Sequence, residues 1–130
     1  MKFNSRMAVA VVAAFGLGAV MIEGLHAQAP ARPSIIQVSE INVSNTDGYL
    51  KEYAPKTQAA IKKAGGRFLA AGGKVTNFEG QAVKGRVVLI AWESVEKYQA
   101  YRDSAENKEL RKVGNKYGKF RIYAVEALPQ

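Results

Sequence analysis

Two charged side chains beside glycines are the first candidates for chemistry in this sequence. Arg67 follows directly after Gly65-Gly66, and Glu79 precedes Gly80. An arginine at such a junction could bind a carboxylate through two parallel hydrogen bonds, and a carboxylate beside a turn could act as a general base or orient a ligand hydroxyl. The alternatives are a surface arginine and a strand-end glutamate that accepts backbone N–H bonds.

Trp92 and Glu93 end the strongest strand pattern of the chain, residues 86–93. Successive side chains of a strand point to opposite faces of a sheet, so these two cannot both face one cavity. Trp92 either stacks on an aromatic ligand or packs in the core. Glu93 is a second candidate base.

The chain contains six tyrosines, whose phenols would suit an oxygen-rich or aromatic ligand. Tyr101 is the tyrosine that we assign to a ligand pocket. Ser104, three residues later, is either a ligand donor or a helix cap. A ligand site built from these candidates should bring at least two of the following four side chains to one pocket: Arg67, Glu79, Trp92 and Tyr101.

The sequence has no cysteine, and its only histidine is His26. If the N-terminal segment is removed, the rest of the chain cannot build a Ser-His-Asp or Cys-His nucleophile. It also lacks the usual ligands of zinc and haem. We therefore predict no metal and no cofactor, so that any enzyme here would be cofactor-independent.

The N-terminus has the pattern of a secretory signal peptide. Two basic residues precede an uncharged apolar run, residues 7–22, and small residues follow. Cleavage after Ala27 is favoured, because a cut after Ala29 would place Pro30 beside the scissile bond. The sequence thus predicts a signal peptide over 1–27, a linker over 28–33 and a domain over 34–130, in a secreted or periplasmic protein without membrane contact after cleavage. The alternative is an uncleaved anchor.

The formal net charge of the chain is +8. Part of the excess gathers near the second helical region, in Lys108, Arg111, Lys112, Lys116 and Lys119. A basic patch can attract nucleic acid, but no nucleic-acid-binding motif accompanies this one. We predict a solvated basic face and no nucleic-acid partner.

Hydrophobic periodicity and turn residues predict a β-α-β-β-α-β order. Pro55 should kink the first helix or divide it into two short helices, with Thr46 or Asp47 as its cap. Ser94 should cap the second helix. The predicted strands are 34–41, 67–71, 86–93 and 119–127, with 74–79 as a further strand or an edge arm, and the predicted helical regions are 48–64 and 95–117.

This order is that of a ferredoxin-like α+β sandwich, with helices on one face of a four-stranded antiparallel sheet. The central run Val87-Val88-Leu89-Ile90 does not alternate as a half-solvated strand would. We therefore expect a homodimer that packs its sheet faces together into a barrel-like core. A buried central strand in a monomer is the alternative.

An ordered set of short motifs spans 35–127: DGYLKEY at 47–53, GGRFL at 65–69, Gly72-Gly73, Glu79-Gly80, VLIAWESVE at 88–96, YRDS at 101–104 and FRIYAVE at 120–126. With these motifs the chain resembles domain-of-unknown-function family 1330. The resemblance implies a dimeric α+β barrel but no defined reaction; fold relatives include cofactor-independent monooxygenases, muconolactone isomerases and haem-degrading proteins. The family commonly has Ser-Pro-x-Tyr where this chain has Ser104-Ala105-Glu106-Asn107, so the resemblance does not carry over an aromatic ring for ligand stacking at position 107.

Three functions stay open at this level. The first is an exported homodimer that binds a small molecule. The second is a cofactor-independent monooxygenase- or isomerase-like enzyme on a small aromatic or anionic substrate, with Glu79 or Glu93 as base and Arg67 or a tyrosine as clamp. The third is a structural dimer without a ligand.

Overall fold

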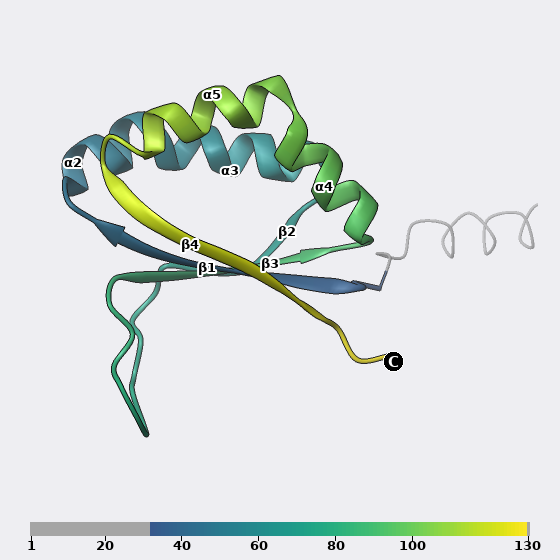
Figure 1. Ribbon diagram of the computed structural model, residues 1–130, viewed down its shortest axis with the longest axis horizontal. Coiled ribbons are helices and arrows are strands. Elements are labelled where there is room, and N and C mark those ends of the chain that lie inside the picture. The colour runs from purple at the N-terminus through teal and green to yellow at the C-terminus, as the bar shows by residue number, and fades with distance from the viewer. Residues whose placement is uncertain (1–31, 130) are drawn as a thin grey trace, which may run out of the picture. The chain divides into compact units, whose positions relative to one another are not determined.

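Four antiparallel strands form one sheet in the order β2-β3-β1-β4. The computed structural model describes residues 32–129, so the predicted signal peptide and most of the predicted linker lie outside the described residues. All the described helices lie on one face of the sheet (Figure 1). The strands are β1 (Ile35–Val43), β2 (Arg67–Ala71), β3 (Arg86–Trp92) and β4 (Gly118–Glu126).

The helical layer of residues 32–129 is made of five pieces, three before β2 and two after β3. No helix within these residues has the length and apolar character needed to cross a bilayer. The predicted β-α-β-β-α-β order and the α+β ferredoxin-like sandwich are confirmed. The pieces are α2 (Thr46–Gly48), the π-helical turn η1 (Tyr49–Tyr53), α3 (Ala54–Lys63), α4 (Val95–Asp103) and α5 (Ala105–Gly114).

The first helical region begins at Thr46, two residues earlier than predicted. Asn45 is its cap, because its Oδ1 accepts a hydrogen bond of 3.0 Å from the Gly48 backbone N–H. The region is divided as predicted, but the break is the π-helical turn that precedes Pro55. Pro55 itself lies in the first turn of α3, where a missing N–H costs nothing.

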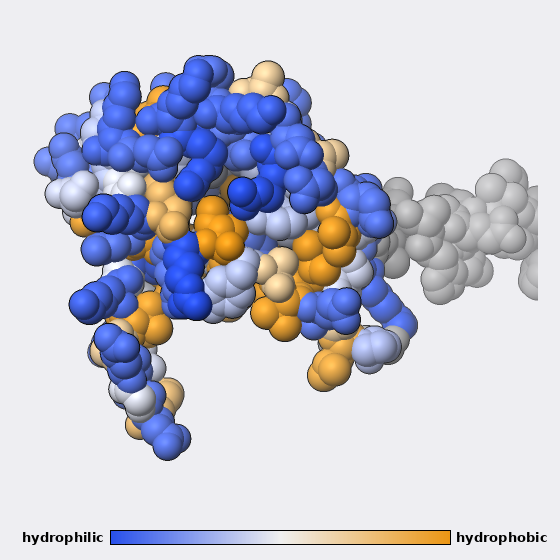
Figure 2. Space-filling view, in the orientation of Figure 1, coloured by the Kyte–Doolittle hydropathy of each residue, from blue (hydrophilic) through white to orange (hydrophobic). Residues whose placement is uncertain are grey.

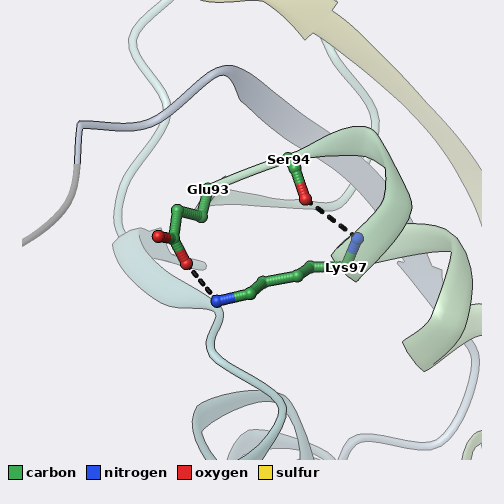
Figure 3. Close-up of polar contacts among 3 residues, drawn as sticks. All are labelled: Glu93, Ser94 and Lys97. Carbon is green, nitrogen blue, oxygen red and sulfur yellow. Dashed lines mark hydrogen bonds and ion pairs between the residues drawn. The ribbon is translucent and has the colours of Figure 1, made fainter.

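Two serines begin the helices that follow β3. Ser94 Oγ accepts from the Lys97 backbone N–H at 3.1 Å, which confirms the predicted cap of α4 (Figure 3). Ser104 caps α5: its Oγ accepts from the Asn107 backbone N–H at 3.2 Å and donates to the Tyr101 carbonyl at 2.6 Å. The second serine therefore separates two helices that would otherwise run together.

Alternation along β1 decides which side chains meet the helices. Ile35, Gln37, Ser39 and Ile41 are all buried against the helical layer, whereas the intervening residues turn to the other face. The glycine that ends α3, Gly65, has a φ of 102°, a conformation that other residues rarely adopt. It confirms the predicted helix stop before β2.

Residues 72–85 form no strand, contrary to the strand predicted over 74–79. This segment extends from the sheet on the side opposite the helices (Figure 1). Gly72 turns the chain away at the end of β2 with a φ of 77°, so the following residues have no neighbouring strand with which to pair. Of the two predictions for 74–79, a further strand or an edge arm, the edge arm is the better description of this projecting segment.

The core between sheet and helices consists of two clusters of aromatic and aliphatic side chains. In the first, the Trp92 ring packs against Tyr98 and Tyr101, with centroid distances of 5.4 and 5.5 Å. In the second, Tyr53 packs against Tyr49 at 5.4 Å and Phe120 at 5.5 Å. Side chains from both clusters line one cavity.

Candidate functional site

A cavity of about 80 Å³ lies between the sheet and the helices. This volume is several times the roughly 10–15 Å³ that one water molecule needs. Aromatic and aliphatic side chains form much of the wall, and a few polar groups interrupt it. Besides the tyrosine hydroxyls, the polar side chains of the wall are Gln37, Ser39, Thr57, Gln58, Arg86, Arg102, Asn107 and Arg111.

Four buried polar atoms with no hydrogen-bond partner among the described residues belong to side chains that line this cavity. They are Thr57 Oγ1, Arg86 Nε, Tyr101 OH and Arg111 Nη1. A buried polar atom without a partner costs roughly 1–3 kcal/mol, and native proteins contain few of them. Four such atoms belong to the wall of one cavity, so the described residues leave its hydrogen-bonding groups partly unsatisfied.

Arg86 begins β3 and is held from two sides. Its Nη2 donates to the Ala71 carbonyl at 3.4 Å, and its guanidinium lies 5.5 Å from the centre of the Tyr49 ring. A Cβ on Gly72 would lie only 2.5 Å from the same Nη2. The glycine therefore provides the space in which this guanidinium rests.

Arg111 and Arg102 approach the cavity from the helices. The Arg111 guanidinium lies 4.0 Å from the centre of the Phe120 ring, within the range of a cation–π contact. Arg102 Nη1 donates to the Tyr98 hydroxyl at 3.4 Å. Both arginines are thus held by aromatic rings rather than by carboxylates.

The phenols of Tyr101 and Tyr49 keep their protons at physiological pH. Burial raises the pKa of Tyr101, and the nearby Tyr53 and Glu106 raise it further, while Arg111 lowers it. Burial likewise raises the pKa of Tyr49. The Tyr101 hydroxyl is therefore available as a hydrogen-bond donor.

A buried hydrogen-bonded chain fixes the sheet side of the cavity. The Trp92 indole N–H donates to Gln37 Oε1 at 3.0 Å, and Gln37 Nε2 donates to Ser39 Oγ at 2.9 Å. Because the Ser39 oxygen accepts this bond, its own proton is free to be donated elsewhere. Gln37 and Ser39 both line the cavity, whereas Trp92 does not.

Of the four side chains expected to share a pocket, only Tyr101 lines the cavity. Arg67 is exposed and pairs with Ala91 across the sheet, which places it on the face opposite the helices. Glu79 is exposed in the segment 72–85. Trp92 is 1% exposed and packs in the core, the alternative given for it. The expected gathering does not occur.

The remaining predicted site residues, Glu93 and Ser104, have structural roles. The Glu93 side chain is exposed and forms an ion pair with Lys97 on α4 (Figure 3). Ser104 is the cap of α5. Asn107 does line the cavity, and its Nδ2 donates to the Arg102 carbonyl at 2.9 Å. A small amide thus stands in the wall where the resembled pattern has an aromatic ring.

Most of the cavity's polar side chains were missed as site residues, among them Thr57, Arg86 and Arg111, although the sequence carried signals for some. Thr57 is a polar residue within the apolar stripe of its helix, a departure that a buried hydroxyl explains. Arg111 stood out only as part of a basic cluster, and Arg86 only as the start of a strand. The hydrogen bond between Trp92 and Gln37 joins residues 55 positions apart, and no local sequence pattern predicts it.

Comparison with solved structures gives the fold but no activity. A crystal structure of a protein of unknown function from Rhodopseudomonas palustris has a TM-score of 0.56 and 13% identity over 85% of this chain and 93% of the other. The methylated form of that protein gives a TM-score of 0.56 and 14% identity, with coverage of 84% and 90%.

A conserved protein of unknown function from Bacteroides thetaiotaomicron, described as a possible oxidoreductase, gives a TM-score of 0.49 and 17% identity, with coverage of 74% and 100%. No curated protein matches the chain. The model of the domain of unknown function DUF1330 matches residues 35–128, and the chain therefore belongs to that family.

Proposed function

We propose that this protein is an exported homodimer that binds a small molecule in the cavity between its sheet and its helices. The observation that carries the proposal is the set of four buried polar atoms around that cavity, which have no partner among residues 32–129. Ligand sites are mostly apolar pockets with a few convergent polar groups, and this cavity has that character.

Binding is favoured over catalysis because no carboxylate side chain of the described residues lines the cavity. The two candidate bases, Glu79 and Glu93, are both exposed. An enzyme acting by proton abstraction needs its base within hydrogen-bond reach of the substrate. The polar side chains that do reach the cavity are arginines, amides and hydroxyls, which suit recognition by hydrogen bonds.

Export rests on the N-terminal sequence pattern, a basic start followed by an apolar run and small residues. Mass spectrometry of the intact protein recovered outside the cytoplasm tests it. A mature N-terminus at Gln28 supports cleavage after Ala27, whereas a full-length chain in the membrane fraction would leave the anchor as the explanation.

The proposed homodimer pairs the sheet faces that no described helix covers. Ile36, Val38 and Leu89 lie half-buried on this face, and Tyr123 and Val125 are 41% and 53% exposed. Figure 2 shows apolar side chains gathered over the strands, below the hydrophilic surface of the helices. A second copy presents the same apolar patch, so one two-fold contact would cover both.

The projecting segment 72–85 supports the same arrangement. It extends on the side of the open sheet face and carries Phe78, whose side chain is 94% exposed (Figure 1). Light scattering of the mature chain should give a dimer, and Val38→Lys should shift it to a monomer of about 11 kDa, the mass expected for 103 residues. A wild-type monomer at micromolar concentration would exclude the dimer.

The binding function is tested by filling the cavity. Thr57→Leu replaces an unpartnered hydroxyl with apolar volume on a helix, so the free protein should be as stable as wild type or more stable. Calorimetric titration with a panel of small acids, amides and alcohols should show binding to wild type that Thr57→Leu abolishes. Equal binding to both proteins would remove the cavity as the site.

A further inference from the structure

The electrostatics of the cavity narrow the class of ligand. Three arginines line it, Arg86, Arg102 and Arg111, and no aspartate or glutamate of the described residues does so. The ion pairs found within residues 32–129 involve Lys97, Lys112 and Arg121, none of them in the wall. Glu106 lies near enough to raise the pKa of the Tyr101 phenol but does not line the cavity. The wall therefore carries positive charge without a paired anion.

The hydrogen-bonding groups point to the same class. Arg86 Nε and Arg111 Nη1 can only donate, and the hydroxyls of Thr57 and Tyr101 can donate as well. A ligand that satisfies all four must supply several acceptor lone pairs. A carboxylate supplies about four and has the charge that guanidinium groups prefer.

The aromatic rings hold these arginines in place without neutralising them. Arg86 lies against Tyr49 and Arg111 against Phe120, and Tyr53 packs between those two rings. Cation–π contacts orient a guanidinium but leave its N–H edge free for an anion. The same rings offer an apolar surface to the rest of a ligand.

We infer that the cavity takes a small organic acid, whose carboxylate accepts hydrogen bonds from Arg86 Nε and Arg111 Nη1 and whose apolar body packs on the neighbouring rings. The inference rests on the proposed function and names its ligand class. Inorganic phosphate shares the charge but lacks the apolar body, so it binds more weakly.

Calorimetry on the purified protein at fixed ionic strength separates these possibilities. The probes are acetate, butyrate and benzoate, each paired with its uncharged amide, together with inorganic phosphate. We expect at least one acid to bind about 10- to 100-fold more tightly than its amide, the worth of a charge-assisted hydrogen bond, and more tightly than phosphate.

Substitutions of the two arginines test whether the carboxylate of the ligand binds between them. Arg86→Gln or Arg111→Gln should weaken acid binding at least about 10-fold and change amide binding little. Arg111→Lys should have an intermediate effect, because lysine keeps the charge but lacks the planar set of N–H donors of a guanidinium. Lys112→Gln removes a charge from the next, exposed position of α5 and should leave binding unchanged. Circular dichroism confirms that each variant is folded.

Each outcome decides between the two proposals. If amides bind as tightly as acids to wild type and not to Thr57→Leu, the cavity is a ligand site and the organic-acid inference is wrong. The inference is equally overturned if neither arginine variant weakens acid binding, or if phosphate binds best. If no probe distinguishes wild type from Thr57→Leu, the proposed function falls as well.

Discussion

The Trp92 indole N–H donates a 3.0 Å hydrogen bond to Gln37 Oε1, which joins the end of β3 to the first half of β1 beneath the helices. Both residues are buried, Trp92 to 1% and Gln37 to 6% exposure. The bond lets a glutamine occupy a core position of β1, because each end of its amide has a partner. The positions of the two polar side chains on the sheet side of the cavity, Gln37 and Ser39, depend on this hydrogen bond.

Trp92→Phe should lower the free energy of unfolding by about 2–4 kcal/mol, since it removes buried volume and leaves Gln37 Oε1 unpartnered. Urea denaturation measures the loss. Gln37→Leu alone leaves the indole N–H unpartnered, and the double variant should cost at least about 1 kcal/mol less than the sum of the two. Additive losses would show that the hydrogen bond contributes nothing.

Gly72→Ala should weaken the binding of any acid that occupies the cavity, because the new Cβ would displace the Arg86 guanidinium. Gly80→Ala is the matched control: its φ is also 77°, but a Cβ there meets nothing within 4 Å. Both changes should cost about 1 kcal/mol of stability from backbone strain. Equal effects of the two on calorimetric binding would contradict the contact.

Tyr101→Phe should leave the stability of the free protein within about 0.5 kcal/mol of wild type at neutral pH, because the deleted hydroxyl has no partner among the described residues. The same change should weaken ligand binding. A loss of several kcal/mol in urea denaturation would mean that the hydroxyl already has a structural role.

Stability should fall at alkaline pH. The pKa of Tyr101 is raised by burial above its unfolded value of about 10, so the folded state holds the phenol proton longer than the unfolded state. Its contribution is complete below pH ~10 and is lost as the pH rises toward the folded pKa. The urea midpoint should therefore decline above pH ~10, and less steeply in Tyr101→Phe; parallel curves would refute the shift.

Ser104→Ala should destabilise the protein by about 1–2 kcal/mol, since the side chain both accepts from the Asn107 backbone N–H and donates to the Tyr101 carbonyl. Ser94→Ala removes only the acceptor role at α4 and should cost about 1 kcal/mol. If Ser104→Ala cost less than Ser94→Ala, its bond to Tyr101 would have no energetic weight.

Much of the fold was predictable because its signals are local. Glycine with positive φ ended α3, β-branched runs marked three of the strands, and serines marked the starts of α4 and α5. For 74–79 the sequence left a further strand and an edge arm open. The strand was wrong because a strand needs a neighbour, and the turn at Gly72 carries the chain away from the sheet. Pairing is a property of two segments, which one segment cannot reveal.

The site was less predictable for a related reason. Arg67 and Glu79 were chosen for their position beside glycines, yet the face on which a side chain lies follows from sheet register. Arg67 pairs with Ala91 and so lies on the open face, whereas the next residue, Phe68, lines the cavity. One step along a strand exchanges a cavity residue for a surface residue.

Trp92 is the single tryptophan of the chain, and one hydrogen-bonded residue separates its ring from the cavity. Indole emission responds to the polarity and hydrogen bonding around the ring. The molecule therefore carries an intrinsic optical reporter beside its own candidate site: a ligand that disturbs the Gln37 amide will change the fluorescence of one known residue, with no label attached.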